Sequence, residues 1–127
     1  MKKVLIVDDN PVARSYIGYC LKQFALEIIY AEDGLDALAK LRREIPDLIF
    51  LDINMSQMNG FVLCRKLKNE EKTKNIPIVF VTVRNTDWDR KWGIKAGANG
   101  YITKPFGYEE INEAVRTFLP PEEEDNQ

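Results

Sequence analysis

The sequence predicts an α/β fold in which five β-α units, (βα)5, form a doubly wound domain around a parallel sheet of five strands. Short, mostly apolar runs alternate with longer amphipathic segments along the chain. This alternation is typical of parallel sheets that are covered by helices on both faces. The length of 127 residues is also close to what five such units and their connections need, so no second domain is expected.

The first unit is predicted from a strand at Lys3–Val7, where apolar residues run without alternation as in a central parallel strand. Asn10 can cap the helix that follows, with Pro11 at its first helical position. The helical period then places four apolar residues on one face, namely Ile17, Cys20, Leu21 and Phe24.

The second and third units follow the same pattern. Strands are expected at Ile28–Ala31 and Leu48–Leu51. Asp33 can cap the second helix, and either Asn59 or Gly60 begins the third. The expected apolar positions of the second helix recur every three residues, at Leu35, Leu38 and Leu41, and those of the third are Leu63, Cys64 and Leu67.

The fourth and fifth units complete the sheet with strands expected at Ile78–Val83 and Tyr101–Ile102. Thr86 and Asp89 can cap the fourth helix, which Gly97 ends. The two tryptophans, Trp88 and Trp92, are expected to pack on a face of this helix. The fifth helix is defined by Ile111, Ala114, Val115 and Phe118.

The domain is expected to span residues 1–119. Residues 120–127 are expected to form a disordered acidic tail, because four of them are acidic and no aliphatic or aromatic residue occurs among them. Without the tail's four carboxylates, 16 acidic residues face 18 basic ones, so the body has no basic excess and we expect no nucleic-acid partner. No apolar run suits a signal peptide or a membrane span, which predicts a cytoplasmic protein without a membrane partner. Cys20 and Cys64 are expected to be buried thiols in a reducing compartment.

The chain contains no histidine. This excludes Ser-His-Asp and Cys-His catalysis, histidine-ligated zinc or haem, and a phosphohistidine on the chain itself. Any phosphohistidine involved in its function must belong to another protein.

Polar residues follow the strands, at the edge where ligands bind in this fold class. They are Asp8 and Asp9, Asp52 and Asn54, Thr82, and Lys104 with Pro105. Clustered carboxylates repel one another by about 4 kcal/mol per pair at 4 Å and an effective dielectric constant near 20, and a divalent cation relieves that repulsion. Oxygen ligands alone favour Mg²⁺, with Mn²⁺ as the alternative.

A metal held by carboxylates beside a lysine and a hydroxyl suits phosphoryl transfer. Serine or cysteine would need a general base as nucleophile, whereas a carboxylate is already ionised at neutral pH. An aspartyl phosphate is therefore the expected intermediate.

The chain resembles a response-regulator receiver domain from Lys2 to about Leu119. Four motifs carry the resemblance: Val-Asp-Asp at 7–9, Leu-Asp-Ile-Asn-Met at 51–55, Val-Thr at 81–82 and Gly-Tyr-Ile-Thr-Lys-Pro-Phe at 100–106. The resemblance implies the flavodoxin-like strand order 2-1-3-4-5.

The resemblance also implies a role for each site residue. Asp52 would accept the phosphoryl group, and Lys104 would contact one of its oxygens. Asp8, Asp9 and Asp52 would hold Mg²⁺ directly or through water, together with the backbone carbonyl of Asn54. Thr82 and Tyr101 would form a switch pair, and Lys104-Pro105 would be a cis peptide bond.

The partners implied are a sensor histidine kinase or a histidine phosphotransfer protein, and a downstream protein target. The target would bind the surface made by the fourth helix, the fifth strand and the fifth helix, since no output domain follows Leu119. Apart from accepting and losing its own phosphoryl group, the chain is not expected to be an enzyme. Residues 92–98 are most similar to pilus-motility regulators, which favours chemotaxis-type control of motility.

The chain departs from the family pattern at three places. Ser56 stands where proline is usual, and Asn59 where aspartate is usual. Val83 replaces a small residue, so it is expected to crowd Asp52 and slow its reaction with small phosphodonors. With Arg84 next to Val83 in the chain, autodephosphorylation is also expected to be slow.

These departures keep a phosphorylation-independent interaction module open as the main alternative. A Mg²⁺-dependent phosphatase is disfavoured because Asp8-Asp9-Asn10 lacks the Asp-x-Asp spacing. A flavin-binding domain is disfavoured because no phosphate-binding loop follows the first strand.

Overall fold

The computed structural model describes residues 1–120 and contains a five-stranded parallel sheet in the order β2-β1-β3-β4-β5. The strands are β1 (Lys2–Val7), β2 (Leu26–Ala31), β3 (Leu48–Leu51), β4 (Ile78–Thr82) and β5 (Gly100–Thr103). The helices are α1 (Pro11–Cys20), α2 (Gly34–Leu41), α3 (Gly60–Lys68), α4 (Asp87–Ala96) and α5 (Tyr108–Phe118), with a short 3₁₀ turn at Leu21–Gln23. The predicted fold class and strand order are confirmed. The predicted tail lies outside the described residues, apart from Pro120.

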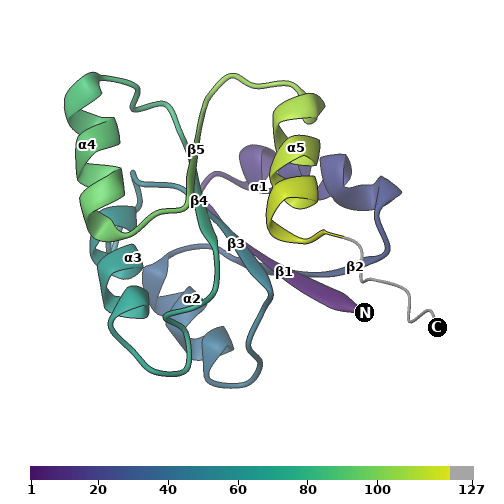
Figure 1. The fold of residues 1–127 in the computed structure, drawn as a ribbon, viewed down its shortest axis with the longest axis horizontal. Helices are drawn as coiled ribbons and strands as arrows, with labels where there is room; N and C mark the ends of the chain where they lie inside the picture. Colours follow the sequence, from purple (N-terminus) through teal and green to yellow (C-terminus); the bar gives the residue numbers. More distant parts are fainter. Residues whose placement is uncertain (121–127) are drawn as a thin grey trace.

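The sheet separates two apolar cores. Helices α1 and α5 cover one face, and α2, α3 and α4 cover the other (Figure 1). Strands β1 and β3 lie between β2 and β4, so their apolar residues are buried on both faces, with Phe50 and Leu51 pointing into opposite cores. A continuous apolar run therefore marks each of these central strands.

The predicted helix starts are confirmed. The side chain of Asn10 accepts hydrogen bonds from the backbone N–H groups of Val12 and Ala13. Asp33 and Asn59 cap α2 and α3 in the same way. Thr86 and Asp89 form a reciprocal capping box on α4, and Gly97 ends that helix with a φ of 102°. Because each helix follows a parallel strand after a connecting loop, the N-termini of the helices lie toward the carboxyl ends of the strands.

Four of the five strands differ from the prediction by one or two residues at an end, and β3 alone has the predicted bounds. Strand β2 begins at Leu26, before the predicted Ile28. It is an edge strand with Glu27 and Tyr30 exposed, so its sequence lacks the continuous apolar run of a central strand. Strand β4 ends at Thr82, and Val83 is an exposed loop residue.

Two predictions about helix faces were wrong. Leu35 is exposed, because the buried stripe of α2 consists of Gly34, Ala37 and Leu41. Trp88 is 66% exposed, and its ring contacts Trp92 edge to face with the centroids 5.7 Å apart. The small residues Gly93 and Ala96 occupy the side of α4 that packs on the sheet.

Candidate functional site

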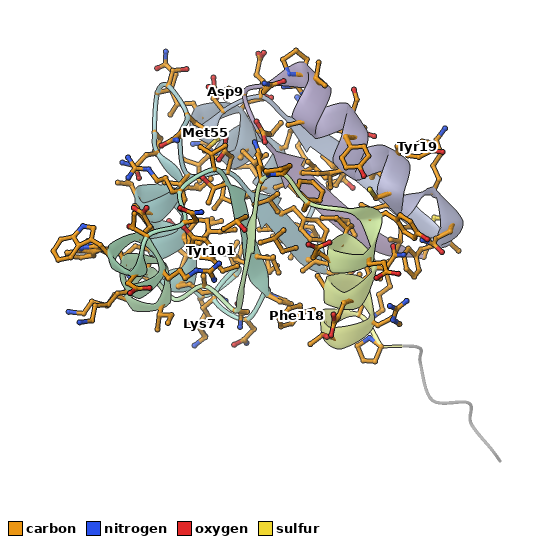
Figure 2. All side chains as sticks on the ribbon, turned by 90° about the horizontal axis from the view of Figure 1, so that it is seen from above. Asp9, Tyr19, Met55, Lys74, Tyr101 and Phe118 are labelled. Carbon is orange, nitrogen blue, oxygen red and sulfur yellow. The ribbon has the colours of Figure 1, made fainter. Side chains whose placement is uncertain are left out.

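The carboxyl ends of β1 and β3 bring three predicted carboxylates together. The backbone N–H of Asp52 donates to the carbonyl of Val7 at 3.0 Å, which aligns the ends of the two strands. Asp8, Asp9 and Asp52 each offer a carboxylate oxygen, and these atoms lie within 4.8 Å of one another. Asp8 and Asp52 are buried and Asp9 is exposed. In Figure 2, Asp9 and Met55 lie toward one edge of the molecule, opposite Lys74 and Phe118.

Lys104 joins this cluster from the end of β5. Its Nζ lies 2.8 Å from Oδ2 of Asp8 and 3.6 Å from Oδ2 of Asp52. The backbone N–H of Lys104 donates to the carbonyl of Thr82, which aligns the ends of β4 and β5. The Lys104-Pro105 peptide bond is cis, as predicted. A single ammonium group thus bridges two buried carboxylates.

The surroundings of Asp52 act on its pKa in opposite directions. Burial and the charge of Asp8 raise the pKa above the usual aspartate range. Lys104, the Thr82 hydroxyl and the N–H of Ile53, which donates to Oδ1 at 2.8 Å, counteract that rise. Asp52 is therefore a buried carboxylate whose charge depends on neighbouring cations and donors.

The donor set fits a hard divalent cation. It consists of oxygen atoms only, and two of the three carboxylates share one lysine as their cationic partner. Mg²⁺ prefers such oxygen ligands and keeps some of its water molecules. The backbone carbonyl of Asn54 accepts no hydrogen bond from the described residues, so it is available as a further ligand.

Thr82 and Tyr101 occupy different positions around this site. Thr82 is fully buried at the end of β4, beside Asp52. Tyr101 is half-buried on β5, and its ring packs against Phe80 with the centroids 6.0 Å apart. The Tyr101 hydroxyl donates to the backbone carbonyl of Arg84 at 2.7 Å. The predicted pair is thus connected through the loop that follows β4.

Sequence reasoning missed the part played by Arg84 in this loop. Its Nε donates to Oδ1 of Asn54 at 2.7 Å, and its Nη1 lies 3.1 Å from Oδ1 of Asp89. The guanidinium group therefore links the loop after β3 to the first turn of α4. Its separation from Asn54 by 30 positions in the chain gives no local signal for this contact.

Gly60 was predicted only as a helix start, but it also supports the site. Its N–H donates to the carbonyl of Ile53 at 2.9 Å. A Cβ atom at this position would lie 2.8 Å from the Cα of Ile53 and closer still to the carbonyl oxygen of Asp52. Glycine therefore allows α3 to begin directly against the backbone of the candidate phosphoacceptor.

Comparison with known proteins identifies the family. The family model described as the response regulator receiver domain matches residues 4–116. The chain belongs to the receiver domain family. It is 34% identical over 119 residues to protein PilH of Pseudomonas aeruginosa, covering 94% of this chain and 98% of that protein.

Two solved receiver structures are similar to the whole described fold. The chemotaxis protein CheY4 of Vibrio cholerae has a TM-score of 0.87 at 32% identity, covering 94% of this chain and 99% of that one. The receiver domain of the sensor histidine kinase PA1611 of Pseudomonas aeruginosa has a TM-score of 0.85 at 26% identity. The match covers 94% of this chain and 98% of that one. That structure has a magnesium ion coordinated in its active-site cleft.

Membership in the family establishes the general class of function. Receiver domains are signalling modules of two-component systems that take phosphoryl groups from histidine kinases and bind Mg²⁺ at an acidic pocket. They are not conventional enzymes. Among residues 1–120, no helix is both long and apolar enough to cross a membrane.

Proposed function

We propose that this chain is a phosphorylation switch in which Asp52 accepts a phosphoryl group from a phosphohistidine on a sensor kinase or phosphotransfer protein. One observation carries the proposal: Asp8, Asp9, Asp52 and Lys104 converge at one edge of the sheet. This arrangement provides a nucleophile, a set of cation ligands and a positive charge for the transferred group.

Each residue of the receiver site has a proposed task in the transfer. An oxygen of ionised Asp52 attacks the phosphorus, and the bond from phosphorus to the imidazole nitrogen of the donor breaks. Asp8, Asp9, Asp52 and the Asn54 carbonyl would hold Mg²⁺, which neutralises charge on the phosphoryl oxygens when bound. We propose Mg²⁺ rather than Mn²⁺, since the similar kinase receiver carries magnesium.

Lys104 is proposed to change partners during the transfer. It is held between Asp8 and Asp52 in the unmodified chain. A phosphoryl group on Asp52 presents three oxygens near this ammonium, and charge-assisted hydrogen bonds to them are stronger than neutral ones. Lys104 then pairs with the product.

The output step is proposed to run through Thr82 and Tyr101. A phosphoryl oxygen gives the Thr82 hydroxyl a new acceptor, which draws the loop after β4 toward Asp52. That loop contains the Arg84 carbonyl bound by the Tyr101 hydroxyl, so movement of the loop disturbs the tyrosine. An equilibrium shift from 1:99 to 99:1 needs about 5.5 kcal/mol, which several charge-assisted hydrogen bonds can supply.

The altered surface is proposed to be the one formed by α4, β5 and α5, where a downstream protein would bind. Similarity to a chemotaxis protein supports a motility pathway, and so does the resemblance of residues 92–98 to pilus-motility regulators. We further propose a cytoplasmic location, where the kinase would meet this receiver, and no nucleic-acid or membrane partner.

The mass of the intact protein tests this function. Incubation with phosphoramidate and Mg²⁺ should add the mass of one phosphoryl group, and chelation of Mg²⁺ should prevent the addition. Asp52→Asn should abolish the addition, whereas Asp87→Asn, a matched change at an exposed carboxylate outside the cluster, should leave it intact. Labelling retained in Asp52→Asn would refute the assignment. Absence of both labelling and Mg²⁺ binding in the unaltered chain would favour the phosphorylation-independent interaction module.

A further inference from the structure

Helix α4 exposes an aromatic surface that the phosphoacceptor site does not use. Trp88 is 66% exposed, and Trp92 is half-buried beside it. The Nζ of Lys95 lies 5.6 Å from the centroid of the Trp92 ring. Exposed tryptophans with neighbouring cations are typical of the residues that dominate binding at protein interfaces.

This surface lies on a different flank of α4 from Tyr101. The buried residues of α4 are Asp89, Gly93 and Ala96. With 3.6 residues per turn, Trp88, Trp92 and Lys95 fall on one side of that buried stripe, while Arg90 and Ile94 fall on the other. The guanidinium carbon of Arg90 lies 4.7 Å from the centroid of the Tyr101 ring, which places the second flank next to β5.

The charge of the helix surface is strongly one-sided. Arg90, Lys91 and Lys95 are exposed, and Asp87 is the exposed carboxylate of the same helix. Within residues 1–120, none of these three cations forms an ion pair, and two of them lie over aromatic rings instead. Such a surface is electrostatically complementary to an acidic partner.

We propose that Trp88, Trp92 and Lys95, the tryptophan flank of α4, together with exposed Lys91 three residues after Trp88, form a docking surface for an acidic segment of another protein. An apolar side chain of that segment packs against the indole rings, and its carboxylates pair with Lys91 and Lys95. The acidic residues of this chain at 122–125 have no aliphatic or aromatic residue among them, so they match only the charge of the flank. The surface exists in the unphosphorylated chain, so the proposal does not depend on the chemistry of Asp52.

Binding of synthetic peptides to the unphosphorylated full chain tests the proposal. The probes are fluorescein-labelled 12-residue peptides with four glutamates around one leucine or phenylalanine at varied spacing, and fluorescence anisotropy reports binding. Trp88→Ala should weaken the tightest peptide at least about fivefold, which follows from the loss of an aromatic anchor. The matched control is Ile94→Ala, which truncates a 74%-exposed side chain on the opposite flank and should change affinity by less than about twofold.

Further measurements separate the components of the surface. Replacing the apolar residue of the peptide by serine should weaken binding, and raising the salt from about 0.05 M to about 0.5 M should also weaken it. The proposal is overturned if no acidic peptide binds, or if Trp88→Ala and Ile94→Ala have equal effects. Sedimentation velocity provides a second test: a dimer of the full chain that Trp88→Ala dissociates would assign this flank to a second copy and overturn the proposed partner.

Discussion

Replacing Gly60 by alanine tests how closely α3 must approach Asp52, the proposed phosphoacceptor. The added Cβ would lie 2.8 Å from the Cα of Ile53 and closer to the carbonyl oxygen of Asp52, whereas ordinary contacts begin at 3.4 Å. Both obstacles are backbone atoms, so no side-chain rotation relieves the overlap. The start of α3 must move away, and the hydrogen bond from the Gly60 N–H to the Ile53 carbonyl is lost or weakened.

The expected loss is about 3 kcal/mol in the free energy of unfolding. Overpacking costs about 1–3 kcal/mol, and the hydrogen bond contributes about 1 kcal/mol. Because Asp52 lies at the point of overlap, phosphorylation by phosphoramidate should also slow. Urea unfolding can be followed by tryptophan fluorescence, which reports on α4 because both tryptophans lie there, and by circular dichroism as an independent probe.

Gly107→Ala is the matched control for this substitution. Gly107 precedes α5 and has a φ of −96°. Among the described residues, a Cβ atom added there would have one neighbour within 4 Å, Oε1 of Glu110 at 3.6 Å. The control should lower the free energy of unfolding by less than about 1 kcal/mol, which is the typical cost of replacing a helix N-cap residue. If Gly60→Ala cost no more than Gly107→Ala and left the phosphorylation rate unchanged, the close approach of α3 to Asp52 would not be needed.

Three further predictions concern single side chains. Lys104→Ala should slow phosphorylation about 10- to 100-fold, measured by intact mass over time, because a charged hydrogen bond contributes about 1.5–3 kcal/mol; an unchanged rate would remove Lys104 from the transfer. Val83→Ala should speed reaction with phosphoramidate and shorten the lifetime of the phosphoryl group, and if neither rate changes, the predicted crowding of Asp52 is wrong. Burial raises the pKa of Cys64 to about 11, so the folded chain keeps the thiol proton to a higher pH than the unfolded chain. That stabilisation is complete below about pH 9 and is lost as pH rises toward 11, so the urea midpoint of the unaltered chain should fall more steeply over this range than that of Cys64→Ala.

Much of the fold was predictable because its determinants are local. A buried parallel strand needs a continuous apolar run, and the runs ending at Val7 and Leu51 identify β1 and β3. Helix caps depend on residues three positions apart, as in Thr86 and Asp89. Prediction failed where the neighbours decide burial: Leu35 lies on the periodic apolar pattern of α2, but the packed side of that helix is defined by Gly34 and Ala37.

The chemical character of the site was also predictable from the sequence. Parallel strands end at a common edge, so acidic residues after two strands and a lysine after another were expected to meet, and Asp8, Asp52 and Lys104 do. The absence of histidine from the chain assigned the phosphohistidine to another protein. The first conclusion follows from the alternation of strands and helices, and the second follows from residue composition alone.

Only the tertiary structure decided which distant groups are in contact around that site. The link from Arg84 to Asn54 and Asp89, and the bond from the Tyr101 hydroxyl to the Arg84 carbonyl, join two loops, helix α4 and strand β5. The close approach of Gly60 to the backbone of Asp52 and the exposure of Trp88 likewise depend on how helices pack on the sheet. The physical reason is that capping and hydrophobic periodicity act between neighbours in sequence, whereas a side-chain contact depends on the relative positions of whole elements.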